Sequence, residues 1–227
     1  EGLKLESPFD YERQMVFCIV NDLPVKQNTE EALAIKTASF INRITKAMQG
    51  RTLVLFTSHR YLRLVCRQLE HELADSSLRI LAQGIDGDRD FLIRDFINND
   101  QSVLLGTSSF WEGVDIPGES LSCVIMTKLP FQPPDSPILE ARTTLYESMG
   151  RDPFRELHLP EAIIRFKQGF GRLIRTKADK GAVILLDDRI INKYYGRHFL
   201  KSLPIQTHCR GSSEQIIKLV EKQNAMV

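Results

Sequence analysis

Short runs of consecutive apolar residues recur along the chain and alternate with stretches of helix length. Runs in which nearly every residue is apolar are typical of parallel strands buried on both faces of a sheet, whereas half-exposed strands alternate apolar and polar positions. The pattern therefore predicts strands over Met15–Val20, Thr52–Phe56, Leu78–Ala82, Ser102–Gly106, Cys123–Thr127 and Ala182–Leu186.

The intervening stretches carry helix start signals. Asn28 is positioned to cap the first helix, which has Glu31 in its first turn, and Ser58 to cap the second. Ser212 or Ser213 is placed to cap a closing amphipathic helix. Because strands and helices alternate, we expect an α/β fold with a parallel sheet covered by helices on both faces. The predicted helices are Glu30–Met48, Arg60–Leu73, Asp88–Ile97 and Ser212–Gln223.

A proline-rich segment over residues 130–160 breaks this alternation. A helix-like stretch, Ile138–Met149, lies within it. We interpret the segment as an arm, partly helical, inserted between two strands. Its prolines are Pro130, Pro133, Pro134, Pro137, Pro153 and Pro160.

Length and charge set the scale of the molecule. A domain typically holds roughly 100–200 residues, so the 227 residues predict one large domain over 1–227 with 130–160 as its arm. Thirty Lys and Arg against 29 Asp and Glu leave a net charge of +1. Any contact with nucleic acid must therefore come from a local basic strip.

Cysteine spacing and hydropathy indicate the compartment. Cys18, Cys66, Cys123 and Cys209 are widely spaced, without CxxC metal spacing, and predict reduced residues of a cytoplasmic protein. No apolar run approaches the ~20 residues that span a bilayer, and no signal-peptide pattern is present, so we expect no membrane partner. The opening Glu1-Gly2, without Met, predicts a piece of a longer chain.

The densest chemical signal lies in Pro160–Arg175. If this segment is one helix, four polar residues at i, i+3, i+7 and i+10 share a face: Arg165, Gln168, Arg172 and Arg175. The opposite face is then an apolar stripe of Ile163, Phe166, Phe170, Leu173 and Ile174. Gly169 and Gly171 each cost about 1 kcal/mol inside a helix, so we expect the backbone to be closely approached there.

Paired guanidinium groups have a specific chemical use. Their forked donors match the oxygens of a phosphoryl group in transfer and neutralise its charge. The alternative is an exposed basic helix face without a ligand, and the spacing alone does not separate the two.

Several motifs resemble the DinG/XPD family of superfamily 2 DNA helicases, and bacterial DinG in particular. The segment Gln168–Arg175, followed by 179–181 and a strand ending at 186–189, is similar to helicase motif VI. Residues 106–118 (GTSSFWEGVDIPG) resemble motif V, and 53–58 (LVLFTS) resemble motif IV. Similarity also extends to 7–11 and 195–204, so it covers nearly the whole chain.

The resemblance implies a RecA-like second motor lobe and assigns roles within it. Arg172 and Arg175 would be arginine fingers for the γ-phosphate of ATP, and Gln168 would couple that contact to the neighbouring lobe. Gly113 and Asp115, together with Glu112, would line the nucleotide cleft, with Asp115 suited to ribose hydroxyls.

Small hydroxyl residues follow two of the predicted strands. The carboxyl ends of parallel strands are where open α/β sheets place ligands. The hydroxyls could hold phosphates of single-stranded DNA without reading sequence, although each is equally well explained as a helix cap. They are Thr57, Ser58, Thr107 and Ser108. Trp111 could stack on a base, but we expect it to pack in the core.

Parts that a complete helicase needs do not occur in this sequence. There is no GxxxxGK[ST] phosphate loop and no suitably placed acidic motif for Mg²⁺. We therefore expect ATP and Mg²⁺ to be bound mainly by a first RecA-like lobe of the same polypeptide, preceding Glu1. The sequence also offers no ligand set for an iron–sulfur cluster. We expect a monomer associated with the bacterial nucleoid.

Three functions remain open at this stage. The first is the second lobe of an ATP-dependent 5′-to-3′ DNA helicase, inactive alone, with polarity implied by the family. The second is the ATP- and DNA-binding half of a DinG-type exonuclease that does not unwind. The third is a free-standing nucleic-acid-binding module, which the near-neutral charge disfavours.

Overall fold

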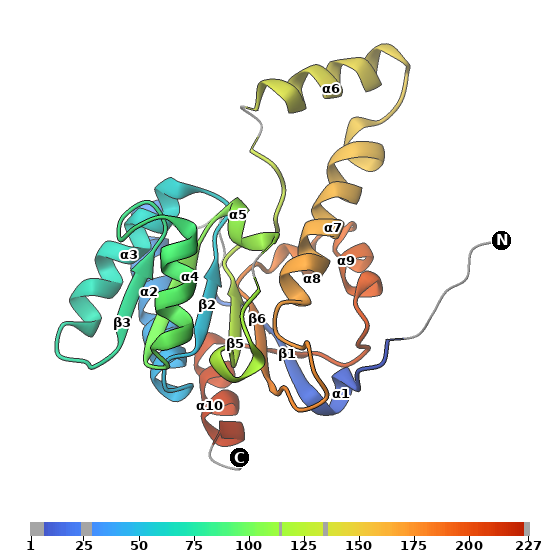
Figure 1. The fold of residues 1–227 in the computed structure, drawn as a ribbon. Coiled ribbons are helices and arrows are strands. Elements are labelled where there is room, and N and C mark those ends of the chain that lie inside the picture. Colours follow the sequence, from blue (N-terminus) through green and yellow to red (C-terminus); the bar gives the residue numbers. More distant parts are fainter. Residues whose placement is uncertain (1–6, 24–28, 114, 134–135, 225–227) are drawn as a thin grey trace.

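A parallel sheet forms the centre of the protein (Figure 1). The computed structural model describes residues 7–23, 29–113, 115–133 and 136–224. Within them seven strands pair in the order β3-β4-β2-β5-β6-β1-β7, and every pair is parallel. They are β1 (Met15–Val20), β2 (Thr52–Leu55), β3 (Arg79–Ala82), β4 (Ser102–Gly106), β5 (Cys123–Met126), β6 (Gly181–Leu185) and β7 (Cys209–Gly211).

The predicted α/β class is confirmed, as are the six predicted strands to within one residue at each end. The edge strand β7 was not predicted, because it is three residues long and Arg210 at its centre is exposed. In β5, Cys123 and Ile125 face one side of the sheet, and Val124 and Met126 face the other. All four are buried, which explains why a continuous apolar run marks this strand.

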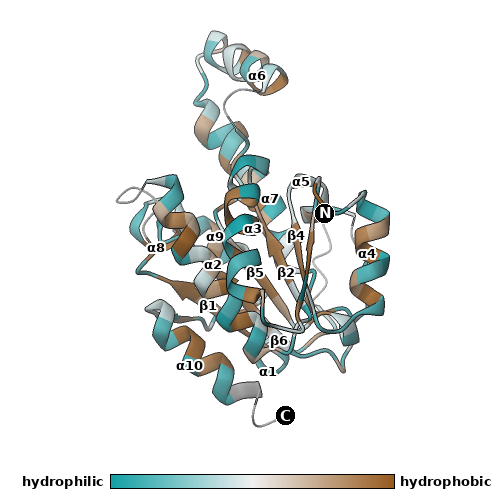
Figure 2. Cartoon of the chain, turned by 90° about the vertical axis from the view of Figure 1, so that its left-hand side faces the viewer, coloured by the Kyte–Doolittle hydropathy of each residue, from teal (hydrophilic) through white to brown (hydrophobic). Residues whose placement is uncertain are grey.

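Helices cover both faces of the sheet. One core cluster joins the sheet to α2, α3 and α10, and a second joins the opposite face to α4, α5, α7, α8 and α9. Figure 2 shows the strands as mainly hydrophobic elements flanked by helices that mix polar and hydrophobic residues. The helices are α1 (Tyr11–Gln14), α2 (Glu30–Ala47), α3 (His59–Leu73), α4 (Arg89–Asn98), α5 (Ser108–Trp111), η1 (Gly118–Ser120), α6 (Pro137–Ser148), η2 (Phe154–His158), α7 (Leu159–Phe170), α8 (Arg189–Asn192), α9 (Gly196–Ser202) and α10 (Ser213–Asn224).

Side-chain caps fix the starts of the first long helices. Thr29 caps α2, since its side chain accepts a hydrogen bond from Ala32 N; the predicted cap, Asn28, lies outside the described residues. Ser58 caps α3 as predicted, accepting from Tyr61 N at 3.2 Å. No helix formed by the described residues has the length and apolar character needed to cross a membrane.

The segment between β5 and β6 projects from the sheet and returns to it. Figure 1 shows α6 standing away from the sheet layers, with the returning limb running into α7. That limb is η2, a π-helix, which continues directly into α7. The arm is tied to α7 by Glu161, whose carboxylate binds Arg142 at 2.6 Å and Gln132 at 3.0 Å. The first turns of α7, which precede the motif VI residues, are therefore continuous with the arm.

Candidate functional site

The helix that carries the motif VI residues is shorter than predicted. α7 ends at Phe170, and the chain turns there, with Arg172 N bonded to Gly169 O at 3.3 Å. The prediction that one helix face presents Arg165, Gln168, Arg172 and Arg175 is therefore wrong: the last two lie in the following loop. Two glycines explain the end of the helix, because glycine is a poor helix former. Gly169 also has a packing role, since an added Cβ would lie 2.8 Å from the Trp111 ring.

Arg172 nevertheless points to the motif V segment. Its Nε and Nη2 donate to the carbonyl of Trp111 at 3.2 and 2.8 Å. Trp111 is only 2% exposed, and its Nε1 donates to Phe56 O at 2.9 Å. Core packing of Trp111 is thus confirmed, and in this structure the ring is too buried to stack on a base.

Arg175 faces the same segment from the far end of the loop. Its guanidinium forms an ion pair with Asp115, whose side chain is 90% exposed. The loop itself is held by Asp179, which accepts from Arg175 N at 2.7 Å and from Thr176 N at 2.8 Å. Gln14 donates to the carbonyls of Thr176 and Asp179. Motif VI and motif V are therefore brought together by the fold.

Burial and charge act together on these groups. Burial lowers the pKa of Arg172 from its usual value, and the charge of Arg89 adds to this. Burial also lowers the pKa of Arg175. Although burial raises the pKa of Asp179, hydrogen bonds from Thr176 and from the Arg175 amide outweigh it and leave that pKa below its usual value. Two partly desolvated guanidiniums thus reach the motif V segment: Arg172 binds the carbonyl of Trp111, and Arg175 is paired with the exposed Asp115.

Gln168, near the end of α7, and Glu112, directly after α5, are two further candidate residues of the site. Gln168 Oε1 is buried, yet no hydrogen-bond donor among the described residues reaches it. Buried acceptors normally have a partner, so Gln168 Oε1 has unused hydrogen-bonding capacity at this site. Glu112 Oε1 lies 3.8 Å from Arg165 Nε, and the Glu112 side chain is about half exposed.

Two residues that the sequence analysis missed hold the motif V segment. Gln83, directly after β3, accepts from Thr107 N at 2.7 Å and donates to Ser109 Oγ at 2.9 Å. Arg89, at the start of α4, donates to the carbonyls of Ser109, Glu112 and Gly113. No motif match could have found them, because their contacts arise only when β3 and α4 pack beside β4.

Gly113 occupies a position that requires glycine. Its φ is +66°, in the left-handed region, and an added Cβ would lie 3.2 Å from an Arg89 nitrogen. The next residue, Val114, lies outside the described residues. Gly113 is exposed, and its carbonyl is held by Arg89.

The four predicted DNA-contact residues do gather at the carboxyl ends of β2 and β4, but they are not equivalent. Ser108 is exposed and Thr57 is half-buried, whereas the Ser58 hydroxyl is taken up as the α3 cap. Thr107 is 2% exposed, and its hydroxyl contacts Gln83 at 2.9 Å and His59 at 3.1 Å. Thr107 therefore shapes the loop instead of facing solvent, which corrects the expectation of a direct phosphate contact.

No group of three or more His, Cys, Asp or Glu side chains comes together as a metal site within the described ranges. The cysteines are free thiols, three of them buried, as predicted. Burial and the neighbouring Cys209 raise the pKa of Cys18 to about 12, which leaves this thiol unreactive near neutral pH.

The chain is similar in sequence to bacterial proteins named as a DNA helicase and as an exonuclease. "3'-5' exonuclease DinG" of Bacillus subtilis (strain 168) is 43% identical over 204 residues, which cover 89% of this chain and 22% of that protein. "ATP-dependent DNA helicase YoaA" of Escherichia coli (strain K12) is 42% identical over 204 residues, covering 90% and 31%. The chain thus spans about a third or less of these relatives.

Solved structures share the fold. An XPD helicase structure superimposes with a TM-score of 0.66 at 22% identity, covering 87% of this chain and 35% of that one. The C-terminal domain of the DEAD-box protein Dbp5 superimposes with a TM-score of 0.54 at 18% identity, covering 92% and 97%. These likenesses confirm the RecA-like architecture.

The sequence model of the family described as "Helicase C-terminal domain" matches residues 41–206, which include the motif V segment and the loop after α7. With relatives named DinG and YoaA, this match agrees with the resemblance drawn from the motifs. The chain belongs to the helicase C-terminal domain family and is of the DinG/XPD type.

Proposed function

We propose that this chain is the second motor lobe of an ATP-dependent 5′-to-3′ DNA helicase and is inactive alone. The convergence of Arg172 and Arg175 on the motif V segment carries the proposal: both guanidiniums reach the loop that holds Gly113 and Asp115. Two positive groups presented together beside an exposed carboxylate suit a nucleotide that carries both phosphates and a ribose.

The residues present fit ATP as a ligand shared with the first RecA-like lobe. Arg172 and Arg175 would donate to phosphate oxygens and neutralise charge as it builds up on them. Asp115 is exposed enough to accept hydrogen bonds from ribose hydroxyls. Gln168, whose buried Oε1 has no donor among the described residues, would find its partner at the boundary with that lobe. ATP with Mg²⁺ supplies the free energy of hydrolysis to the movement along DNA.

The proposed DNA track crosses the carboxyl ends of β2 and β4. Ser108 and Thr57 would contact phosphates there, while Ser58 and Thr107 would shape the surface through their bonds to Tyr61 and Gln83. Such contacts position a strand without reading its sequence. The partners are thus single-stranded DNA and the first RecA-like lobe of the same polypeptide, in a monomeric cytoplasmic protein.

Unwinding assays on the full-length protein test this proposal. A labelled duplex with a 5′ single-stranded overhang should be opened with ATP and Mg²⁺, whereas a duplex with a 3′ overhang should stay intact. The 227-residue chain alone should release no phosphate from ATP. Turnover by the chain alone, or preference for the 3′ overhang, would contradict the assignment.

A second candidate function follows from one relative. The Bacillus subtilis protein is named a 3′-5′ exonuclease. On this alternative the chain would be the ATP- and DNA-binding half of a DinG-type exonuclease that does not unwind. The same assay separates the two, because an exonuclease shortens the labelled strand whereas a helicase releases it at full length.

A further inference from the structure

Basic residues gather in the segment that forms α8, α9 and β7, although carboxylates of other segments contact it: Asp187 pairs with Arg189, Glu12 binds Thr207 and Asp22 binds Ser213. Residues 189–213 contain five Lys and Arg and no Asp or Glu. In a chain with a net charge of +1, this is a strong local concentration of positive charge. Because the net charge is close to zero, contact with nucleic acid requires a local basic strip, and the surface of this segment provides one.

Part of this surface is hollowed. A hollow of about 450 Å³ lies between α8, α9 and the edge strand β7. Its lining combines basic, aromatic and aliphatic side chains without a carboxylate: Ile190, Ile191, Lys193, Tyr194, Arg197, Leu200, His208 and Arg210. Lys193, Arg197 and Arg210 are exposed at its rim.

These three cations have no carboxylate partner in the part of the chain that the structure describes. No carboxylate of the described residues lies within 4 Å of a side-chain nitrogen of Lys193, Arg197 or Arg210. In contrast, the nearby Arg189 is paired with Asp187 at 2.6 Å. Three neighbouring positive charges without counterions repel one another, so the surface is suited to an anionic ligand with several charges.

Tyr194 adds an aromatic face to the same hollow. The residue is 61% exposed, which is high for a large aromatic residue. Tyr195 supports it edge-on, with ring centroids 5.5 Å apart and an angle of 77° between the rings. A supported, exposed ring beside unpaired cations matches the way in which proteins bind single strands, with bases stacked and phosphates neutralised.

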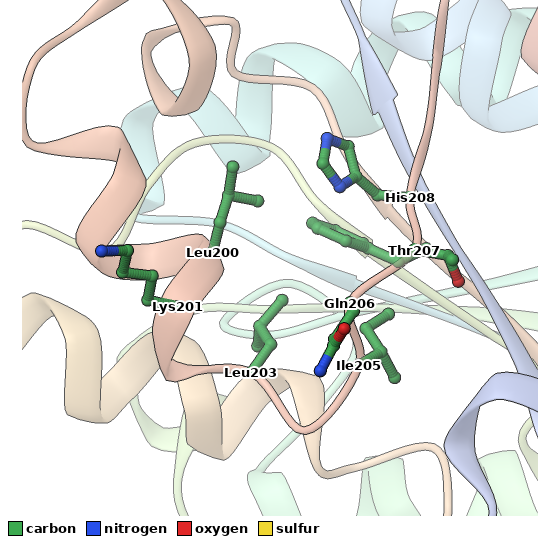
Figure 3. A pocket seen from close by; sticks show the side chains of 8 residues that line it. Leu200, Lys201, Leu203, Ile205, Gln206, Thr207 and His208 are labelled. Carbon is green, nitrogen blue, oxygen red and sulfur yellow. The ribbon is translucent and has the colours of Figure 1, made fainter.

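The basic surface continues around α9. A second hollow of about 400 Å³ shares Leu200 and His208 with the first and also has no acidic lining residue. Figure 3 shows Leu200 on α9 beside the extended segment that carries Ile205 to His208, with the Lys201 side chain directed away from that segment. Lys201 therefore extends the positive surface to the other side of the helix.

We propose that Lys193, Arg197 and Arg210 form a phosphate-binding surface for single-stranded nucleic acid, with Tyr194 stacking on a base. α8 follows β6, whose carboxyl end lies at the same edge of the sheet as those of β2 and β4. The surface would thus lengthen the proposed DNA track along this edge. It rests on the proposed function only for the identity of the ligand.

The test measures binding of a fluorescein-labelled oligo(dT) to the 227-residue chain, without nucleotide, over a range of salt concentrations. R197E/R210E should weaken binding at low salt by about tenfold or more. Its plot of log affinity against log salt should be shallower by roughly 1.4, because each phosphate neutralised on a single strand contributes about 0.7. Tyr194→Ala should weaken binding about tenfold, and Tyr194→Phe should retain it.

A matched variant separates a local site from general charge. R63E/R67E makes the same change in net charge on the exposed side of α3 and should bind almost as the unmodified chain does. Equal losses in the two double variants would overturn the proposal. So would displacement of oligo(dT) by polyglutamate as effectively as by unlabelled oligo(dT), which would indicate an acidic protein ligand.

Thermal unfolding shows whether each variant is folded, and R197A/R210A replaces the charge reversal if that variant unfolds. The alanine variant should show at least about half of the reduction in salt slope expected for R197E/R210E. A slope equal to that of the unmodified chain would overturn the proposal. No ATP is present in this assay, so unchanged oligo(dT) binding in these variants would not contradict the arginine-finger proposal. Conversely, the ATP turnover of arginine-finger variants does not test this surface.

Discussion

The guanidinium of Arg172 is bound to the main-chain carbonyl of Trp111 through Nε at 3.2 Å and Nη2 at 2.8 Å. The Trp111 indole in turn donates to Phe56 O at the end of β2. One chain of hydrogen bonds thus connects the loop after α7 to the motif V segment and to the motif IV strand. A guanidinium held by two bonds from one side keeps its remaining donors in a fixed direction.

Arg175→Ala in the full-length protein should abolish most ATP turnover. Loss of an arginine finger typically lowers the rate by on the order of 10³–10⁵, because charge on the transferring phosphoryl group is no longer neutralised. ATP binding, measured by titration with a fluorescent analogue, should be largely retained. Lys177→Ala removes an exposed positive charge from the same loop and serves as the control. Normal turnover in Arg175→Ala would refute the assignment.

Asp115→Ala should weaken nucleotide binding by about tenfold while the fold is kept, because one charge-assisted hydrogen bond to the ribose is lost. The side chain is 90% exposed, so little packing depends on it. Comparing affinity for ATP with that for 2′,3′-dideoxy-ATP shows whether the ribose is the partner, since the variant should no longer distinguish the two. Glu119→Ala removes an exposed carboxylate four residues further along the chain and should leave both affinities unchanged.

Arg89→Ala should disturb the motif V segment without touching the nucleotide. Arg89 donates to three carbonyls of this segment, so its loss should let Gly113 and Asp115 shift together. A misplacement of about 1 Å can cost roughly 10²-fold in rate, and we expect kcat for DNA-stimulated hydrolysis to fall on that order. Arg94→Ala, on the exposed side of α4, is the matched control. If Arg89→Lys restores kcat in full, the forked geometry of the guanidinium is unimportant.

Asp179→Asn should destabilise the domain by about 1–3 kcal/mol, since three donors of the loop after α7 would lose a charged acceptor. The pKa of Asp179 is lowered in the folded protein from its ordinary value of 3.8. Its stabilising contribution is therefore fully present above that ordinary value and is lost as pH falls through the lower folded value. Urea unfolding of wild type and variant should converge at acid pH.

Asp75→Asn, at an exposed turn, controls for the charge change. A difference between wild type and Asp179→Asn that stays constant from neutral pH down to pH values below the folded pKa would show that the carboxylate charge is not what holds the loop.

The order of strands and helices could be read from the sequence because it depends on local features. Buried parallel strands need continuous apolar runs, and helices need capping residues such as Ser58, so each element leaves its own pattern. The end of α7 was missed for the same local reason. Periodicity continues through Leu173 and Ile174, which are indeed buried, although the chain there has already left the helix.

The sequence by itself also singled out the candidate site residues, because the segments that resemble motifs V and VI have characteristic residue types and spacing. Only the tertiary structure decided how they meet. Arg172 and Arg175 approach Trp111 and Asp115 from a loop, across sixty positions of chain, because parallel strands bring their carboxyl ends to one edge. Gln83 and Arg89, the exposed ring of Tyr194 and the unpaired cations around it carry no pattern along the chain. Their contacts are set by packing between distant segments, which no local signal records.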